Sequence, residues 1–403
     1  MKNSAYILLT LLALLFACTK ADLCEEGDHP HPAGVLFSFD WANDAKGLMT
    51  DGQDDNDSVL VLTKRIIGTW VRGFRVASTD GFGYYDINKP EPVFDDDGNP
   101  LPVEGIDNPI NLFKVRTGLY KCIAINRDTT EFDYRAIENY IDDVETGTTL
   151  GDLCVEYKRY SSSSEKLRGA VAGWTDYNIY GGDANYLQPD MLPIYYDTIA
   201  PVAIDRGVQQ QFHFKPVILT QNIDIRFHLR KKYQEDGVKF HVEEIFGGIS
   251  GIPYRLNLST GFFDTENTAK MMFKCELQDE NGRPFVDSDD NEQPMVCHGN
   301  IDVLSLVNSP DAERLRGPGI LQLMIRIKDQ KTIRVKVNLH DVIARARLYE
   351  PVDDGNWGRL RKRSGVLEID TDLVIDEKAV LPSEDGGMEI WVQAGKDDII
   401  VDT

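Results

Sequence analysis

The sequence has few cysteines and histidines, and it lacks the common motifs of catalysis. Six cysteines and seven histidines occur in 403 residues. There is no phosphate loop, no nucleotide-binding glycine pattern, no zinc-type His-Glu pair and no nucleophile with an adjacent base. His213, His228 and His340 lie within strand-like patterns, where a solvated or hydrogen-bonded position is ordinary. Among 66 acidic residues any two carboxylates can meet in space, but with this composition we expect a protein that is not an enzyme and holds no cofactor.

Basic residues are also scarce. The 43 Lys and Arg are outnumbered by 66 Asp and Glu, which gives a formal net charge of −23. Such a chain is expected to repel nucleic acid and anionic membrane surfaces.

A long hydrophobic run is absent as well. The apolar stretch from Ile7 to Ala17, interrupted by Thr10, has about eleven residues, too short for a helix across a ~30 Å hydrocarbon core. With Lys2 before it and small residues after it, the stretch predicts an export signal over residues 1–17. The chain would then begin at Cys18.

Leu15-Phe16-Ala17-Cys18 resembles the lipobox of bacterial lipoproteins, in which the cysteine is acylated and becomes the first residue. Cys18 is therefore the predicted lipid-attachment site, and the alternative is a plain secreted protein with an incidental cysteine. Acylation leaves an odd number of thiols, which excludes a disulfide framework. The remaining cysteines are Cys24, Cys122, Cys154, Cys275 and Cys297.

The dominant hydrophobic period is two residues, which predicts strands. In "ILQLMIRIKD", residues 320–329, Leu321, Leu323, Ile325 and Ile327 alternate with mostly polar residues, and residues 222–231 and 332–341 repeat this pattern. Residues 133–144 form the one plausible helix. Turn residues separate the runs, for example Asp279 to Pro284.

These patterns predict an all-β fold with two tandem antiparallel β-sandwich domains. The Pro-punctuated stretch over residues 188–207 marks the expected boundary. The predicted organisation after the signal is a lipidated tether, an N-terminal domain and a C-terminal domain, over residues 18–34, 35–205 and 206–403.

Three stretches resemble the fimbrial anchor and pilin-like lipoproteins of the Bacteroidales. They are "DLCEEGDHPHPAGVLFSFDW", "EIFGGISGIPYRLNLSTG" and "AVLPSEDGGMEIWVQAGKDDIIVD". The resemblance implies two transthyretin-like domains, lipid attachment at Cys18 in the outer membrane, and a role at the base or tip of a type V pilus with fimbrial subunits as partners. It leaves open whether the chain faces the periplasm or the cell exterior.

Two segments resemble metal sites without meeting their requirements. Cys24, Asp28, His29 and His31 lie close together, but no second cluster completes a tetrahedral shell. The acidic loop over residues 51–58 lacks the ligand spacing of a calcium loop. We therefore expect no metal, with a lead-in to the first strand and a solvated turn as the ordinary roles.

A glycan-binding surface lipoprotein is the alternative function. Trp174, Tyr177, Tyr180 and Tyr186 offer flat rings to sugars, or they close the core of the first domain. A basic cluster, comprising Arg359, Arg361, Lys362 and Arg363, suits anionic glycans or forms a charged hairpin end.

Two pairing hypotheses concern the C-terminal half. Cys275 and Cys297 flank a polar insert between two strand-like runs, and a hairpin there would bring them near disulfide distance. The tail from Gly387 to Thr403 either closes its own sheet or completes the sheet of a neighbouring subunit by strand exchange.

Cys18→Ala is expected to move the protein from the outer-membrane fraction to the soluble fraction and to abolish labelling by radioactive palmitate. Two or three acyl chains make attachment effectively stable, so their loss removes the anchor. Membrane retention without the label would mean that protein contacts hold the chain.

Overall fold

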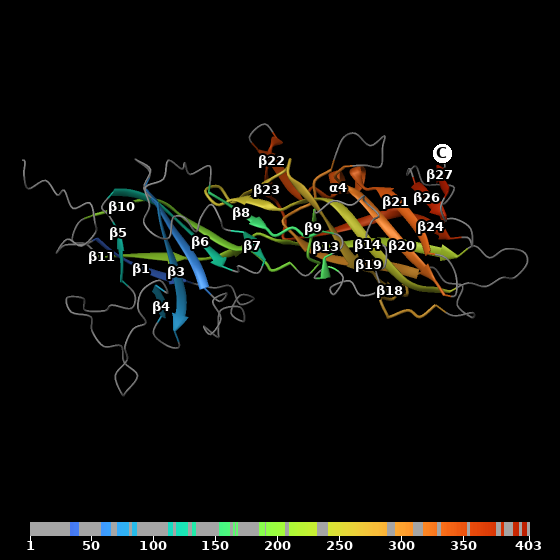
Figure 1. The fold of residues 1–403 in the computed structure, drawn as a ribbon, viewed down its shortest axis with the longest axis horizontal. Coiled ribbons are helices and arrows are strands. Elements are labelled where there is room, and N and C mark those ends of the chain that lie inside the picture. Colours follow the sequence, from blue (N-terminus) through green and yellow to red (C-terminus); the bar gives the residue numbers. More distant parts are fainter. Residues whose placement is uncertain are drawn as a thin grey trace, which may run out of the picture.

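The computed structural model is mostly β, with several antiparallel sheets (Figure 1). The described residues include one short helix that can be followed from end to end, α4 (His340–Ala346). The structure describes residues 33–39, 58–65, 71–79, 83–86, 112–115, 118–127, 131–133, 153–161, 164–165, 167, 185–189, 191–205, 209–231, 241–287, 295–308, 317–328, 332–352, 355–375, 380–382, 390–394 and 397–400.

Sheets 1 and 2 lie at one end of the molecule in Figure 1 and face each other. Sheet 1 has the order β11 (Gln209–Phe214), β1 (Ala33–Phe39), β5 (Leu112–Val115). Sheet 2 has the order β12 (Val217–Ile218), β10 (Tyr195–Ile204), β6 (Gly118–Arg127), β2 (Ser58–Arg65), β3 (Val71–Thr79), β4 (Gly83–Asp86).

Aromatic residues of sheet 1 fill the space between these two sheets. The ring centroids of Phe37 and Phe212 lie 6.3 Å apart, and the ring of Phe39 stacks on that of Phe214 with a centroid distance of 5.3 Å. Tyr120 and other buried residues of sheet 2 complete this cluster. β1 therefore places Phe37 in the core between the two sheets.

Sheet 3 combines strands from both halves of the chain. Its order is β22 (Tyr349–Val352), β23 (Trp357–Leu360), β16 (Phe262–Asp264), β15 (Arg255–Asn257), β8 (Cys154–Tyr157), β7 (Phe132–Asp133).

Sheets 4 and 5 form the second pair of facing sheets. Sheet 4 has the order β18 (Glu276–Gln278), β19 (Met295–Val303), β13 (Gln221–Lys231), β24 (Ser364–Ile375), β25 (Val380–Pro382). Sheet 5 has the order β27 (Asp397–Ile400), β26 (Ile390–Ala394), β21 (Thr332–Asn338), β20 (Ile320–Ile327), β14 (Val242–Pro253), β17 (Thr268–Lys274), β9 (Tyr186–Leu187).

The expected boundary at residues 205 and 206 falls between β10 and β11. Strands before it, β7 to β9, join sheets built largely by the C-terminal half, while β11 and β12 join sheets of the N-terminal half. The chain thus crosses between the two halves more than once, and the two-domain division remains a prediction.

Three pairings among the described strands are parallel, which the sequence did not predict. They join β1 to β11, β13 to β24 and β9 to β17. Each joins segments with other elements between them in the chain, as parallel neighbours must.

β6 and β20 are examples of strands that are buried on both faces, whereas simple alternation predicts one polar face. In β6, Cys122 and Ala124 face sheet 1 while Ile123 and Ile125 belong to the main core, and all four are fully buried. In β20, Leu321, Leu323, Ile325 and Ile327 face the core as predicted, but Gln322 and Met324 are only 1% and 2% exposed. A small cluster over the outer face of sheet 5 covers this side, with Leu167, Tyr186, Phe246, Met272 and Met324.

The helix expected over residues 133–144 lies outside the described residues, apart from Asp133 in β7. The turn expected at Asp279 to Pro284 is confirmed. Gly282 donates its N–H to the Asp279 carbonyl at 2.9 Å and has a φ of 76°, which favours glycine.

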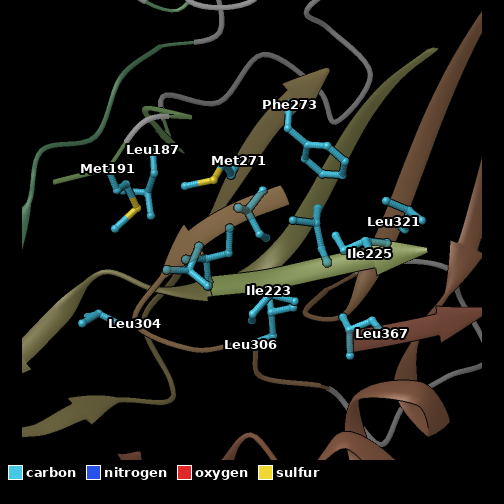
Figure 2. Close-up of a cluster of buried hydrophobic side chains, with 14 of the residues drawn as sticks. Leu187, Met191, Ile223, Ile225, Met271, Phe273, Leu304, Leu306, Leu321 and Leu367 are labelled. Atoms are coloured by element: carbon cyan, nitrogen blue, oxygen red, sulfur yellow. The ribbon is translucent and has the colours of Figure 1, made fainter. Parts of the chain in front are cut away.

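The ring of Phe273 packs in the core between sheets 4 and 5 (Figure 2). A Cβ built on Gly247 would lie 2.3 Å from the ring, and one on Gly299 would lie 2.1 Å from it. Gly247 belongs to sheet 5 and Gly299 to sheet 4, so two glycines let the ring approach both backbones.

Gly299→Ala is therefore expected to lower the free energy of unfolding by about 1–3 kcal/mol through overpacking. Chemical denaturation would measure the loss. Phe273→Leu removes the ring. In a Phe273→Leu background, Gly299→Ala should therefore lower the free energy of unfolding by less than it does in the wild-type background. An equal cost in both backgrounds would show that the Phe273 ring is not the obstacle.

Candidate strand-exchange site

The outer strands of the described sheets are short. The outermost strands have two to six residues, whereas inner strands reach twelve. Short edges limit unwanted pairing, because an outer strand leaves its free N–H and C=O groups open to another chain. A partner strand must therefore use an edge that can be opened or extended.

The C-terminal tail forms one such edge. β26 pairs antiparallel with β21, with Val392 opposite Val335 and Ile390 opposite Val337. β27 then folds back onto β26 and places Ile399 opposite Val392. The tail thus closes its own sheet, one of the two arrangements that the sequence left open, and Asp397 and Asp398 lie inside β27.

β27 is held by one neighbour among the described strands. Four residue pairs join it to β26. At about 0.5–1.5 kcal/mol net for each hydrogen bond, a ladder of about four bonds contributes about 2–6 kcal/mol. That range lies at or below the ~5–15 kcal/mol of global unfolding, so β27 can detach locally. Detachment frees one strand and exposes the edge of β26.

Most of the predicted attachment and metal-site residues lie outside the described residues. These are Cys18, Cys24, Asp28, His29, His31 and residues 51–57 of the acidic loop. Among the residues that the structure does describe, no group of three or more His, Cys, Asp or Glu is arranged to hold a metal ion. No helix in that part of the chain has the length and apolar character needed to cross a membrane.

Of the four aromatic residues proposed for sugar binding, the structure describes Tyr186. Tyr186 is 1% exposed and packs in the cluster over sheet 5. Lys270 Nζ lies 5.7 Å from its ring centroid. Tyr186 is therefore buried, but against sheet 5 of the C-terminal half and not in the core of the first domain, where the sequence analysis placed it. Trp174, Tyr177 and Tyr180 lie outside the described residues.

The hairpin expected around Cys275 and Cys297 forms, but both thiols are free. In the β18–β19 pairing, Cys297 lies opposite Leu277, two residues beyond Cys275. The cysteines are therefore diagonal rather than directly opposite, which separates their Cβ atoms more than a disulfide favours. Both are buried, and burial raises the pKa of each thiol.

The three histidines that fall in strand-like patterns have ordinary surroundings. His213 is exposed on β11, and His228 Nε2 lies 3.9 Å from Glu368 on the neighbouring strand β24. His340 begins α4, and its N–H donates to Asn338 Oδ1 at 2.9 Å.

The basic cluster is exposed and larger than the sequence suggested. Arg359, Arg361, Lys362 and Arg363 lie on β23 and before β24. Lys362 Nζ donates to the Ala346 carbonyl at 2.9 Å, which brings in the end of α4 with two more arginines. The added residues are Arg345 and Arg347. Only the fold joins them, because a hairpin separates the segments.

No protein-family model and no curated protein sequence matches the chain. Solved structures do match over most of its length. A candidate adhesin from Bacteroides ovatus has 12% identity and a TM-score of 0.43, with 86% of this chain and 93% of that chain covered. A candidate adhesin from Bacteroides thetaiotaomicron has 13% identity and a TM-score of 0.39, with coverage of 90% and 98%.

The fimbrial anchor protein Mfa2 from Porphyromonas gingivalis has 10% identity and a TM-score of 0.38, with 92% of this chain and 99% of that chain covered. The chain thus resembles Bacteroidales adhesin candidates and a fimbrial anchor, the kind of protein that its sequence resembles.

We expect the buried thiols to be inert in the folded protein. Burial raises the pKa of Cys122 to about 12, and Cys275 and Cys297 shift the same way, so little thiolate forms at pH 8. A colorimetric disulfide reagent should label these three only after unfolding, at least about a hundredfold faster than in the native state. Failure of Cys275 and Cys297 to react in unfolded, unreduced protein would reveal a disulfide.

Proposed function

We propose that the protein is an outer-membrane lipoprotein that serves as a structural anchor or accessory subunit of a type V-like fimbria. It joins fimbrial subunits by exchange of a β-strand and does not turn over a substrate. The tail edge formed by β26 and β27 carries this proposal, because β27 lies outermost in sheet 5 and a four-pair ladder holds it. The sequence resemblance to anchor and pilin-like lipoproteins supports the same role.

The proposed attachment is through lipid on Cys18. The tether then leads directly into β1, which begins at Ala33. β1 is central in sheet 1, with six residue pairs to β11 and four to β5. Because both ladders hold β1, a pull on the lipid end would be spread over two neighbouring strands.

The proposed organisation is two transthyretin-like sandwiches in tandem, over residues 35–205 and 206–403. The facing of sheets 1 and 2, and of sheets 4 and 5, supports it. A glycan-binding role based on the rings between Trp174 and Tyr186 has less support, because Tyr186 is buried.

Deleting residues 396–403 removes β27 and is expected to reduce co-purification of fimbrial subunits at least tenfold, since a lost ladder of about four bonds exceeds the 1.4 kcal/mol of a tenfold change. The measurement is subunit recovery with the tagged protein, together with the number of cell-attached fibres by negative-stain microscopy.

Deletion of residues 401–403 alone is the matched control, because it leaves β27 in place. Unchanged recovery and attachment in the longer deletion would exclude the tail as the exchanged strand. Fibre number, length and attachment that stay normal without the whole protein would exclude the fimbrial role.

A further inference from the structure

Six exposed or half-buried basic residues gather where α4 ends and β23 leads into β24. The Arg361 N–H donates to the Leu348 carbonyl at 3.1 Å, and Lys362 Nζ donates to the Ala346 carbonyl at 2.9 Å. These bonds fix the segment after β23 against the end of α4. We name the six the arginine surface, which comprises Arg345, Arg347, Arg359, Arg361, Lys362 and Arg363.

Little of this charge is neutralised within the described part of the chain. Arg359 Nη2 lies 2.7 Å from Glu350 Oε2, and this hydrogen bond lowers the pKa of the Glu350 carboxyl. Arg347, Arg361 and Arg363 have no side-chain ion pair among the described residues. Three guanidinium groups on the surface thus remain available to an external anion.

Arg347 occupies a backbone conformation that favours glycine. It follows the last turn of α4 with φ 48° and ψ 52°, the left-handed region, and is the one non-glycine residue with positive φ among the described residues. Glycine is the usual residue there because a Cβ is unfavourable. Among the described residues, no ion pair or side-chain hydrogen bond is recorded for the exposed Arg347, which is the pattern of a residue kept for a function.

An aromatic side chain lies in line with the arginines. Gly358 and Leu360 face the rings and core beneath β23, so Trp357 and Arg359 face the opposite side. Trp357 is half-buried, and the ladder to Leu348 extends the same alternation to Arg361. Successive side chains on this face come from alternate strand residues, so they are spaced by about 6.6 Å along the strand.

We propose that the arginine surface, with Trp357, binds a linear polysaccharide that carries carboxylate or sulfate groups. Guanidinium groups bind such oxyanions through paired N–H donors. A partly exposed indole offers an apolar face to a sugar ring. A row of arginines beside an indole suits a polymer that alternates charged groups with sugar faces. This site is separate from the edge of β27 and from the rings between Trp174 and Tyr186.

The net charge of −23 does not prevent such binding. At physiological ionic strength the Debye length is about 8 Å, so exposed charges beyond that distance are largely screened. An anion at the arginine surface therefore interacts mainly with groups close to it. Among the described residues, Glu350 is an acidic group in contact with this surface, and Arg359 already pairs with it.

The test uses the full-length protein in detergent and measures binding of heparin and of polygalacturonate, with dextran as the uncharged control. Arg361→Gln is expected to weaken binding about three- to fivefold, as loss of one exposed ionic contact. Lys215→Gln, the matched loss of an exposed charge after β11, should leave binding unchanged. Arg347→Gly should weaken binding equally while Tm stays the same or rises, because glycine suits that backbone.

Polyglutamate and vesicles of an anionic phospholipid are tested in parallel. Binding of polyglutamate but not the polysaccharides would overturn the proposal in favour of an acidic protein partner. Binding of vesicles alone would assign the surface to a membrane. No binding of either polysaccharide, or equal weakening by Lys215→Gln, would also overturn it.

Discussion

The need to pair backbone groups at the edges of sheets governs this structure. Among the described strands, each sheet ends in a strand whose outer N–H and C=O groups have no strand neighbour, and these outermost strands are short. β27 is one of these outermost strands, and the four residue pairs that join it to β26 are few enough to open locally. The same constraint that protects the fold therefore leaves one edge suited to exchange.

Strand identity was largely predictable from local pattern. Residues 222–231, 320–329 and 332–341 alternate as expected and form β13, β20 and β21, because one face of each must be buried. The turn at Gly282 was predictable for a similar local reason.

Long-range features were not predictable. Burial of Gln322 and Met324 depends on Leu167 and Tyr186, which belong to a distant segment and cover the outer face of sheet 5. The parallel pairing of β13 with β24 also depends on the fold, not on local pattern. α4 is too short for a helical period, and only its position adds Arg345 and Arg347 to the basic cluster.

The structure separates two roles in space. The facing sheets are held by apolar packing such as the Phe273 ring between Gly247 and Gly299, and no reactive group is needed there. The proposed contacts with other molecules lie at the periphery, namely at the backbone of β27 and at the side chains of the arginine surface. The proposed role as an anchor subunit requires this division, since the core must stay intact while the edges engage partners.

Hydrogen–deuterium exchange in the presence of fimbrial subunits tests the central claim most directly. If the tail edge is the exchange site, bound subunits should alter amide exchange in β26 and β27 and leave β11, the outer strand of sheet 1, unchanged. Unaltered exchange in Ile390–Ala394 and Asp397–Ile400 at saturating subunit, with protection at β11 or another edge, would contradict the account.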